Sequence, residues 1–250
     1  MGDLDAWVVV ALVAAAFLAG LIDSIAGGGG LITLPALLLA GVAPIDALGT
    51  NKVQSVFGSG SATIAYGRAG QVDLRAMAPL AVVSAGGSAL GAATANVIPE
   101  GTLSVLIPIA LVTVAVYFLV RPDPGELQRP RRITPLMFAC TLVPLVGFYD
   151  GVFGPGTGSF FMIAYVALAG YGLLRATGHT KVLNFASNAG ALIVFSVTGT
   201  MLWGVGLLMG AAQVAGATTG SHLALRHGGR LIRPLLVVTC LAMALRLLVD

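Results

Sequence analysis

The sequence carries two copies of one pattern, and this repetition restricts the fold more than any other feature. When the chain is aligned with itself, GLIDSIAGGGG at 20–30 falls on GFYDGVFGPGT at 147–157, and Asp23 falls on Asp150. With two extra residues allowed in the following loop, the match continues to the C-terminus. Internal repeats of this kind indicate that one structural unit is used twice.

The chain contains only two lysines, and both occupy the same place in the repeat. Lys52 falls on Lys181 in the register that holds after the loop, and chance is a poor explanation for that match. We therefore divide the chain into a first repeat at 1–121, a cytoplasmic linker at 122–132 and a second repeat at 133–250.

The composition places both repeats in a membrane. Hydrophobic residues make up 57% of the chain and charged residues only 9%, whereas charged residues make up about 25% of a soluble domain. We predict an all-α, polytopic membrane helical bundle. Its apolar segments are expected at 6–22, 31–43, 49–67, 74–95, 101–121, 133–149, 159–170, 178–198, 203–222 and 230–249. The second segment of each half is too short to cross unaided, because a full span needs about 20 apolar residues.

The arginines give the orientation that we predict, because short cytoplasmic loops are enriched in Lys and Arg. They cluster at 68–75, 121–132 and 226–233, and we expect these loops to be cytoplasmic. The first of these loops corresponds to TGTMLWG at 198–204 in the second half, and the third corresponds to NVIPEG at 96–101 in the first half. Neither of these equivalent loops carries a basic residue. Opposite charge bias in equivalent loops is typical of two inverted-topology repeats. Both termini are then expected outside.

Each repeat contains an aspartate followed by a glycine cluster inside an apolar run. Glycine lets the backbone take positive φ and approach a ligand closely, and matching interruptions in two inverted halves indicate the substrate site of a transporter. We therefore expect broken or re-entrant helices. A helix that restarts after Gly30 or Gly158 would bind an anion at its start, because its free N–H groups and the positive end of its dipole lie there. Tight helix packing is the alternative, and we favour it for isolated glycines such as Gly86, Gly87 and Gly91.

Each lysine needs a partner, because a charged side chain in a bilayer costs about 2.5 to 3.5 kcal/mol. One interpretation is structural, with ion pairs of Lys52 to Asp23 and of Lys181 to Asp150. The other is functional: the lysines bind an anion while the aspartates orient them or carry a proton. Both hold if a paired lysine exchanges partners during transport.

Polar residues follow each lysine at helical spacing and predict a polar path. Ser55, Ser59 and Thr63 follow the first lysine, and Asn184 and Asn188 follow the second.

Other kinds of site are excluded by spacing. GPGTGS at 154–159 lacks the Walker lysine and follows no strand. The cysteines and histidines have no metal or redox spacing, and no nucleophile has a base beside it, so we expect no metal, no cofactor and no enzymatic activity. His179 stands where the first copy has a threonine. We interpret it as a helix cap, with titration near neutral pH as the alternative.

At these residues the sequence resembles the sulfite exporter TauE/SafE family of membrane transporters. The resemblance rests on the glycine-rich and lysine-bearing stretch at 20–70 and on its degenerate second copy at 147–195, and it covers essentially the whole chain. It implies transport of sulfite, sulfonates or related sulfur oxyanions, with export common and uptake also represented.

Together, these observations predict a secondary transporter of a small sulfur-containing anion, sulfite or an organosulfonate, that exports it by alternating access. An anion channel is the alternative. We expect a bacterial-type inner membrane protein whose partners are the small anion and the lipid bilayer, with a homo-oligomer left open and no nucleic acid. The predicted substrate-binding residues are Lys52, Lys181, Asn51, Gln54, Thr180, Asn184, Asn188, Gly28, Gly29, Gly30, Gly156 and Gly158, with Asp23 and Asp150 orienting the lysines or carrying protons.

Overall fold

The computed structural model describes residues 5–120, 130–199 and 201–228. Every regular element in these ranges is helical. The helices are α1 (Ala6–Ala26), α2 (Gly30–Leu39), α3 (Pro44–Arg68), α4 (Leu74–Val97), α5 (Glu100–Val120), α6 (Pro135–Met137), the π-helical turn η1 (Phe138–Leu142), α7 (Val143–Val152), α8 (Thr157–Ala167), α9 (Leu173–Thr198) and α10 (Trp203–His227). The segment predicted at 230–249, both chain ends and most of the linker lie outside the described residues.

Several helices have the length and apolar character of membrane spans. These are α1, α4, α9 and the continuous stretch Pro135–Val152 formed by α6, η1 and α7. Large apolar side chains lie exposed on their outer faces, as at Val82 (71% exposed) and Val197 (85% exposed). Lipid accommodates such side chains, so the all-helical fold is consistent with a polytopic membrane bundle. With 10 and 11 residues, α2 and α8 are too short to cross alone, as predicted.

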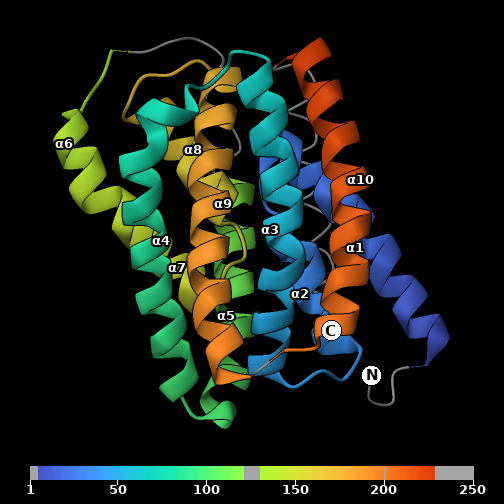
Figure 1. Cartoon of the computed structure of the whole chain (residues 1–250). Helices are drawn as coiled ribbons and strands as arrows, with labels where there is room; N and C mark the ends of the chain where they lie inside the picture. The colour runs from blue at the N-terminus through green and yellow to red at the C-terminus, as the bar shows by residue number, and fades with distance from the viewer. Residues whose placement is uncertain (1–4, 121–129, 200, 229–250) are drawn as a thin grey trace.

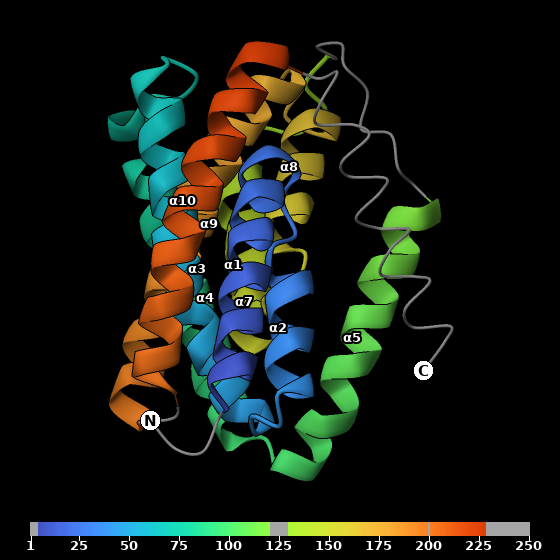
Figure 2. The same ribbon diagram turned by 90° about the vertical axis from the view of Figure 1, so that its right-hand side faces the viewer.

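Two long helices lie side by side at the centre and run in opposite directions. These are α3 and α9 (Figure 1). On one flank α10 packs against α1 and α3, and on the other α4 packs against α7 and α9. Helices at equivalent places in the two halves of the chain therefore make equivalent contacts. In Figure 2, α2 turns back beside α1 after the glycine cluster.

Glycines allow the flanking helices to approach closely. On α4, Gly87 and Gly91 face the backbone of α7, and a Cβ added at Gly87 would lie 2.5 Å from the carbonyl oxygen of Pro144. On α10, Gly216 meets the backbone of α1 in the same way. The packing interpretation is confirmed for Gly87 and Gly91. It is wrong for Gly86, which is exposed and where an added Cβ would have no atom within 4 Å.

Both central helices begin earlier than the sequence pattern predicts. The first starts at Pro44, where a fixed φ suits the first helical position and Asp46 in the first turn complements the helix dipole. The second starts at Leu173 rather than at 178. As a result, Lys52 and Lys181 each lie at the ninth position, counted from Pro44 and from Leu173, well inside their helices.

Candidate functional site

Two helix breaks meet in the middle of the bundle. Between α1 and α2, Gly27 and Gly28 have φ of 83° and 93°, and between α7 and α8, Gly154 and Gly156 have φ of 88° and 82°. Other residues rarely adopt these values. The breaks touch each other, because a Cβ on Gly27 would lie 2.6 Å from the backbone nitrogen of Ser159.

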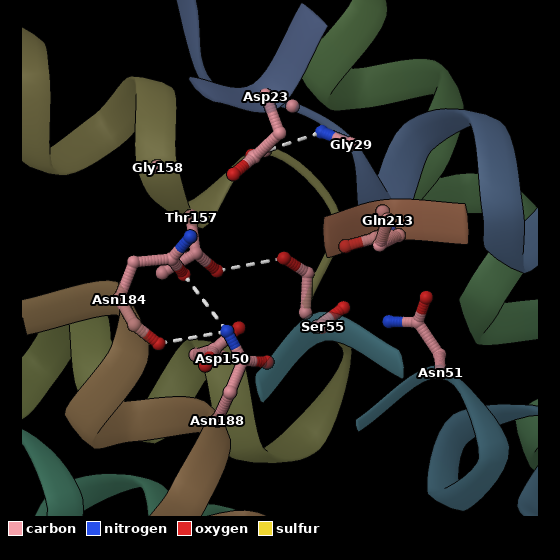
Figure 3. Close-up of a pocket in the computed structure, with 14 residues that line it drawn as sticks. Asp23, Gly29, Asn51, Ser55, Asp150, Thr157, Gly158, Asn184, Asn188 and Gln213 are labelled. Carbon is pink, nitrogen blue, oxygen red and sulfur yellow. Dashed lines mark hydrogen bonds between the residues drawn. The ribbon is translucent and has the colours of Figure 1, made fainter. Parts of the chain in front are cut away.

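A small polar cavity lies between the two breaks (Figure 3). It is lined by Asp23, Gly28, Gly29, Gly30, Asn51, Ser55, Asp150, Gly154, Gly156, Thr157, Gly158, Asn184, Asn188 and Gln213. The space that the centre of a water molecule can reach is about 20 Å³, enough for about one water. A ligand larger than a water therefore needs the lining residues to move apart.

The N-termini of α2 and α8 both face this cavity. Gly28, Gly29 and Gly30 line it from one side, and Thr157 and Gly158 line it from the other. The first N–H groups of a helix have no intrahelical acceptor, and the positive end of the helix dipole lies there. Two of these groups are already used: the Gly29 N–H donates to Asp23 Oδ1 at 3.1 Å, and the Thr157 N–H donates to the Gly154 carbonyl oxygen at 3.3 Å.

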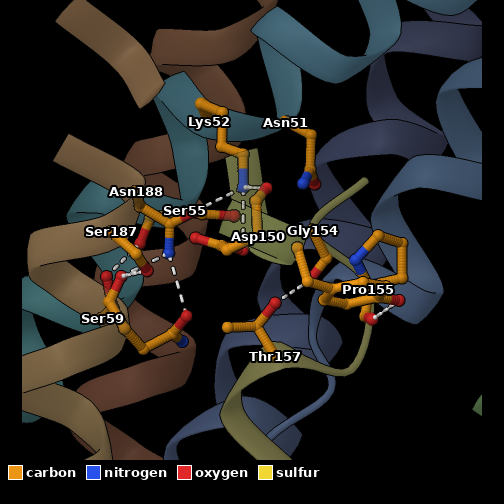
Figure 4. A network of polar contacts seen from close by, with 12 residues as sticks. Asn51, Lys52, Ser55, Ser59, Asp150, Gly154, Pro155, Thr157, Ser187 and Asn188 are labelled. Atoms are coloured by element: carbon orange, nitrogen blue, oxygen red, sulfur yellow. Dashed lines mark hydrogen bonds and ion pairs between the residues drawn. The ribbon is translucent and has the colours of Figure 1, made fainter. Parts of the chain in front are cut away.

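The two lysines form ion pairs that cross between the halves. Lys52 Nζ donates to Asp150 Oδ1 at 2.8 Å, to the Asp150 carbonyl oxygen at 2.6 Å and to Asn188 Oδ1 at 3.3 Å (Figure 4). Lys181 Nζ donates to Asp23 Oδ2 at 2.9 Å and to the Asp23 carbonyl oxygen. The predicted pairs of Lys52 with Asp23 and of Lys181 with Asp150 are therefore wrong.

The crossing follows from the packing of the helix breaks. Each break lies against the long central helix of the other half, as the contact of Gly154 with Lys52 shows: a Cβ on Gly154 would lie 2.9 Å from the lysine Nζ. A hydrogen bond at 3.2 Å from Ser159 Oγ to the carbonyl oxygen of Ala26 joins the two breaks directly. With two lysines and two aspartates, the site is neutral as a whole.

A chain of amides fixes one wall of the cavity. Gln213 Nε2 donates to Gln54 Oε1 at 2.9 Å, and Gln54 Nε2 donates to Asn51 Oδ1 at 2.8 Å. Thr33 Oγ1 donates to the same Asn51 oxygen at 2.7 Å. These bonds leave the Asn51 amide nitrogen as the donor on the cavity side. In Figure 3 this nitrogen points toward the other lining residues.

The opposite wall presents a second free amide. Asn188 Nδ2 donates to Asn184 Oδ1 at 3.2 Å and to the Asn184 carbonyl oxygen at 2.7 Å. Asn184 Nδ2 is then the remaining donor, and it lies 3.5 Å from the Cβ position of Gly158. An anion between the walls would find an amide donor on each side.

The structure brings ten of the fourteen predicted residues to the cavity: Asp23, Gly28, Gly29, Gly30, Asn51, Asp150, Gly156, Gly158, Asn184 and Asn188. The other four lie behind them. Lys52 and Lys181 are buried against the lining aspartates. Gln54 contacts the cavity only through its hydrogen bonds to Asn51 and Gln213. Thr180 is buried away from the cavity, with no hydrogen-bond partner for its hydroxyl within the described residues.

Four lining residues were not predicted as substrate ligands: Ser55, Gly154, Thr157 and Gln213. Ser55 belongs to the predicted polar path, and Gly154 and Thr157 belong to the second glycine cluster, so the motifs contained a signal for them. Gln213 is an isolated amide in the apolar run of α10, and no motif of the sequence marks it. The structure shows its role through its burial (3% exposed) and its hydrogen bond to Gln54.

The rest of the polar path is not open. Ser59 Oγ donates to the Ser55 carbonyl oxygen at 2.6 Å, within its own helix, and neither Ser59 nor Thr63 lines the cavity. His179 is not a helix cap, because α9 begins at Leu173 and Nδ1 of the histidine contacts the Arg175 carbonyl oxygen at 2.8 Å.

In the part of the chain that the structure describes, no three His, Cys, Asp or Glu side chains gather closely enough to hold a metal ion.

Comparison with known proteins identifies relatives along the whole chain. The family model described as "Sulfite exporter TauE/SafE" matches residues 12–247. "Probable membrane transporter protein ORF9" of a Sinorhizobium species is 54% identical over 250 residues, covering 100% of this chain and 96% of the relative. "Probable membrane transporter protein YfcA" of Escherichia coli K12 is 44% identical, covering 94% of this chain and 87% of the relative. A "Probable membrane transporter protein" of Haemophilus influenzae is 40% identical, covering 94% and 92%. No solved structure matches.

Proposed function

We propose, from the premise that this chain belongs to the sulfite exporter TauE/SafE family, that it exports a small sulfur-containing anion as a secondary transporter. The family consists of multi-pass membrane transporters rather than enzymes. The proposed substrate is sulfite or an organosulfonate, and the proposed site is the cavity between the two helix breaks.

The observation that carries this proposal is the convergence of anion-binding groups on one buried cavity. The N-termini of α2 and α8 and the amides of Asn51 and Asn184 all reach it. Uncharged donors of this kind bind an oxyanion well, because they stabilise negative charge without adding a net charge of their own. Lys52 and Lys181 lie directly behind the lining residues, and each can turn from its aspartate to an anion in the cavity.

Alternating access is proposed to arise from two inverted repeats that rock against each other. Two observations support this proposal. The central helices α3 and α9 run in opposite directions (Figure 1), and each half packs its helix break against the other half's central helix. Separation of the halves would break the crossed ion pairs on one side at a time, which frees one lysine for the anion.

The proposed location is a bacterial-type inner membrane, with both termini outside. The described arginine-bearing turn between α3 and α4 and the end of α10 at Arg226 lie at the same end of the bundle in Figure 1. We propose that this end is cytoplasmic, because short cytoplasmic loops are enriched in basic residues.

A channel is the second candidate, and the narrowness of the cavity favours a carrier. The space between the paired breaks holds about one water, and Ser59, the next hydroxyl of the predicted path, donates within its own helix. A conducting channel would need a wider, continuous polar path.

Purified protein in liposomes tests the proposal. Labelled sulfite, thiosulfate and sulfoacetate are each loaded on one side, and exchange against the unlabelled anion is measured. We expect exchange of at least one anion in the parent protein and its loss in Lys52→Ala and Lys181→Ala. A matched control is Arg175→Ala, on the same helix as Lys181 but exposed and outside the cavity. Parental exchange rates in both lysine variants would show that the lysine assignment is wrong.

A further inference from the structure

The two aspartates of the site are bonded differently. Asp23 uses both oxygens: Oδ1 accepts from the Gly29 N–H at 3.1 Å, and Oδ2 accepts from Lys181 Nζ at 2.9 Å. Asp150 uses only Oδ1, which accepts from Lys52 Nζ at 2.8 Å. Its Oδ2 is buried at the cavity and has no hydrogen-bond partner within the described residues. A buried carboxylate oxygen without a partner is costly.

The difference originates in one residue of the repeat. In the register that pairs Asp23 with Asp150, Gly28 falls on Pro155 and Gly29 on Gly156. Gly28 has φ of 93°. Proline cannot adopt this value, because its ring fixes φ at about −65°. The second turn therefore follows another path, in which Gly156 takes φ of 82° while Gly29 has φ of −55°. No N–H of that turn reaches Asp150 Oδ2.

The charges of the site leave no free positive charge for a substrate. Lys52 has used all three of its donors, two on Asp150 and one on Asn188. An anion that enters the cavity therefore adds an uncompensated negative charge to a neutral, buried site. The amides and helix N-termini stabilise part of this charge, and a positive charge that enters with the anion would neutralise it in the buried site.

We propose that Oδ2 of Asp150 is the binding site of a proton that travels with the anion. The proton leaves water and forms an O–H bond at Oδ2, so that the carboxylate becomes a neutral carboxylic acid. The Lys52 ammonium then loses its counter-ion and turns to the entering anion. One singly charged anion and one proton then occupy the site together, and the total charge of the site stays at zero. For a doubly charged anion such as thiosulfate, the proton cancels one of the two charges. Export by this route runs down the outward gradient of the anion. This inference rests on the proposed function and names its coupling ion.

Few other charged groups face Asp150. Lys52 comes from α3, and the Asp23 and Lys181 pair lies across the cavity. On its own helix, the Tyr149 hydroxyl is occupied by a hydrogen bond to the Pro155 carbonyl oxygen at 2.7 Å. Of the neighbouring helices, α4 has Arg75 in its first turn as its only charged residue, and α8 has Tyr165 as its only titratable one. The proton therefore has one carboxylate to occupy at this wall, and Asp150 is the one with a free oxygen.

Liposomes with a pH gradient test this inference on the parent protein. The probes are labelled sulfite and labelled thiosulfate, the second chosen because it carries no proton that titrates near neutral pH. We expect the gradient to drive accumulation of a transported anion, in the direction of proton flow, above the level in protein-free vesicles. If neither anion exchanges at equal pH, the proposed function itself fails. If an anion exchanges but the gradient drives no accumulation, only the proton coupling fails.

Asp150→Asn locates the proton. The asparagine keeps an oxygen acceptor for Lys52 but is uncharged, like protonated Asp150. We expect the ratio of gradient-driven accumulation to exchange at equal pH to fall to zero, whatever the absolute rate of exchange. Asp23→Asn is the matched control, and its ratio of driven accumulation to exchange should equal the parental ratio because both Asp23 oxygens are held.

Three results would overturn the assignment to Asp150. The first is driven accumulation that persists in Asp150→Asn, and the second is an equal loss of drive in Asp23→Asn. The third concerns Asp150→Glu, which restores an acid: if Asp150→Asn loses exchange as well and Asp150→Glu recovers neither activity, the carboxyl group at this position is not the proton site.

Discussion

The crossed ion pairs predict a specific pattern of thermal stability. Lys52→Met removes an ammonium that is 0% exposed and leaves the Asp150 carboxylate, 1% exposed, without its partner. Loss of one member of a buried ion pair costs about 3–5 kcal/mol. For a chain of this size, each kcal/mol lowers the melting temperature by about 2–4 °C. We therefore expect Lys52→Met to melt about 10 °C below the parent protein.

The second substitution distinguishes the crossed pairs from pairs within one half. In Lys52→Met with Asp150→Asn, both charges are gone, and most of the lost stability should return. In Lys52→Met with Asp23→Asn, Asp150 and Lys181 are both left unpaired, so the melting temperature should fall further. The coupling energy of a contacting pair is about 0.5–3 kcal/mol, enough to separate the two double variants.

Fluorescence-detected size-exclusion chromatography of heated, detergent-solubilised protein measures these melting temperatures. The reverse set, built on Lys181→Met, should recover with Asp23→Asn and not with Asp150→Asn. If Lys52→Met were rescued by Asp23→Asn instead, the crossed pairing and the proposed partner exchange built on it would both be refuted.

Three further predictions use the same melting assay with internal controls. Gly27→Ala should destabilise the protein through strain at positive φ, about 1–2 kcal/mol, and through a clash of the added Cβ with the second helix break. It should therefore melt below Gly41→Ala, because Gly41 also has positive φ but an added Cβ there has no atom within 4 Å. Gly87→Val should lower the melting temperature by forcing α4 from α7, whereas Gly86→Val should leave it unchanged because Gly86 faces outward; equal effects would contradict the packing assignment. Gln213→Leu should cost about 1–3 kcal/mol, because it leaves a buried amide oxygen on α3 unpaired, and no change would show that the amide chain adds nothing to stability.

Much of the site was predictable from the repeat. Glycine clusters inside apolar runs indicate helix breaks, and lysines there need a partner because a charge in a bilayer is costly. The two glycine clusters were expected to interrupt helices, and they do so at Gly27 to Gly29 and at Phe153 to Gly156. The restarts expected after Gly30 and Gly158 come earlier, because α2 begins at Gly30 and α8 at Thr157. Helix interruption is a local property of the backbone, so it can be inferred from the chain alone. Within the described residues the apolar segments were located for the same reason, apart from the early starts of α3 and α9.

The remaining features depend on tertiary contacts. From the repeat alone, each lysine could pair with either aspartate. Lys52 pairs with Asp150 because the helix break of the second half packs against the central helix of the first half. Gln213 escaped prediction because its counterpart is Ser84 in the register that pairs the two lysines, so no repeated motif marks it. Thr180 was predicted as a hydrogen-bond donor, and it is the counterpart of Asn51 in the register that pairs the two lysines. Asn51 lines the cavity and Thr180 does not, so the two halves differ at this position.

The central claim is that the anion binds between the two helix breaks. Its most direct test is an experimental structure with selenite, a heavier analogue of sulfite, in which the anomalous scattering of selenium locates the anion. We expect a selenium peak in the cavity between Asn51 and Asn184, within hydrogen-bond reach of the N-termini of α2 and α8. A peak only at another site, in protein that exchanges sulfite in liposomes, would contradict it.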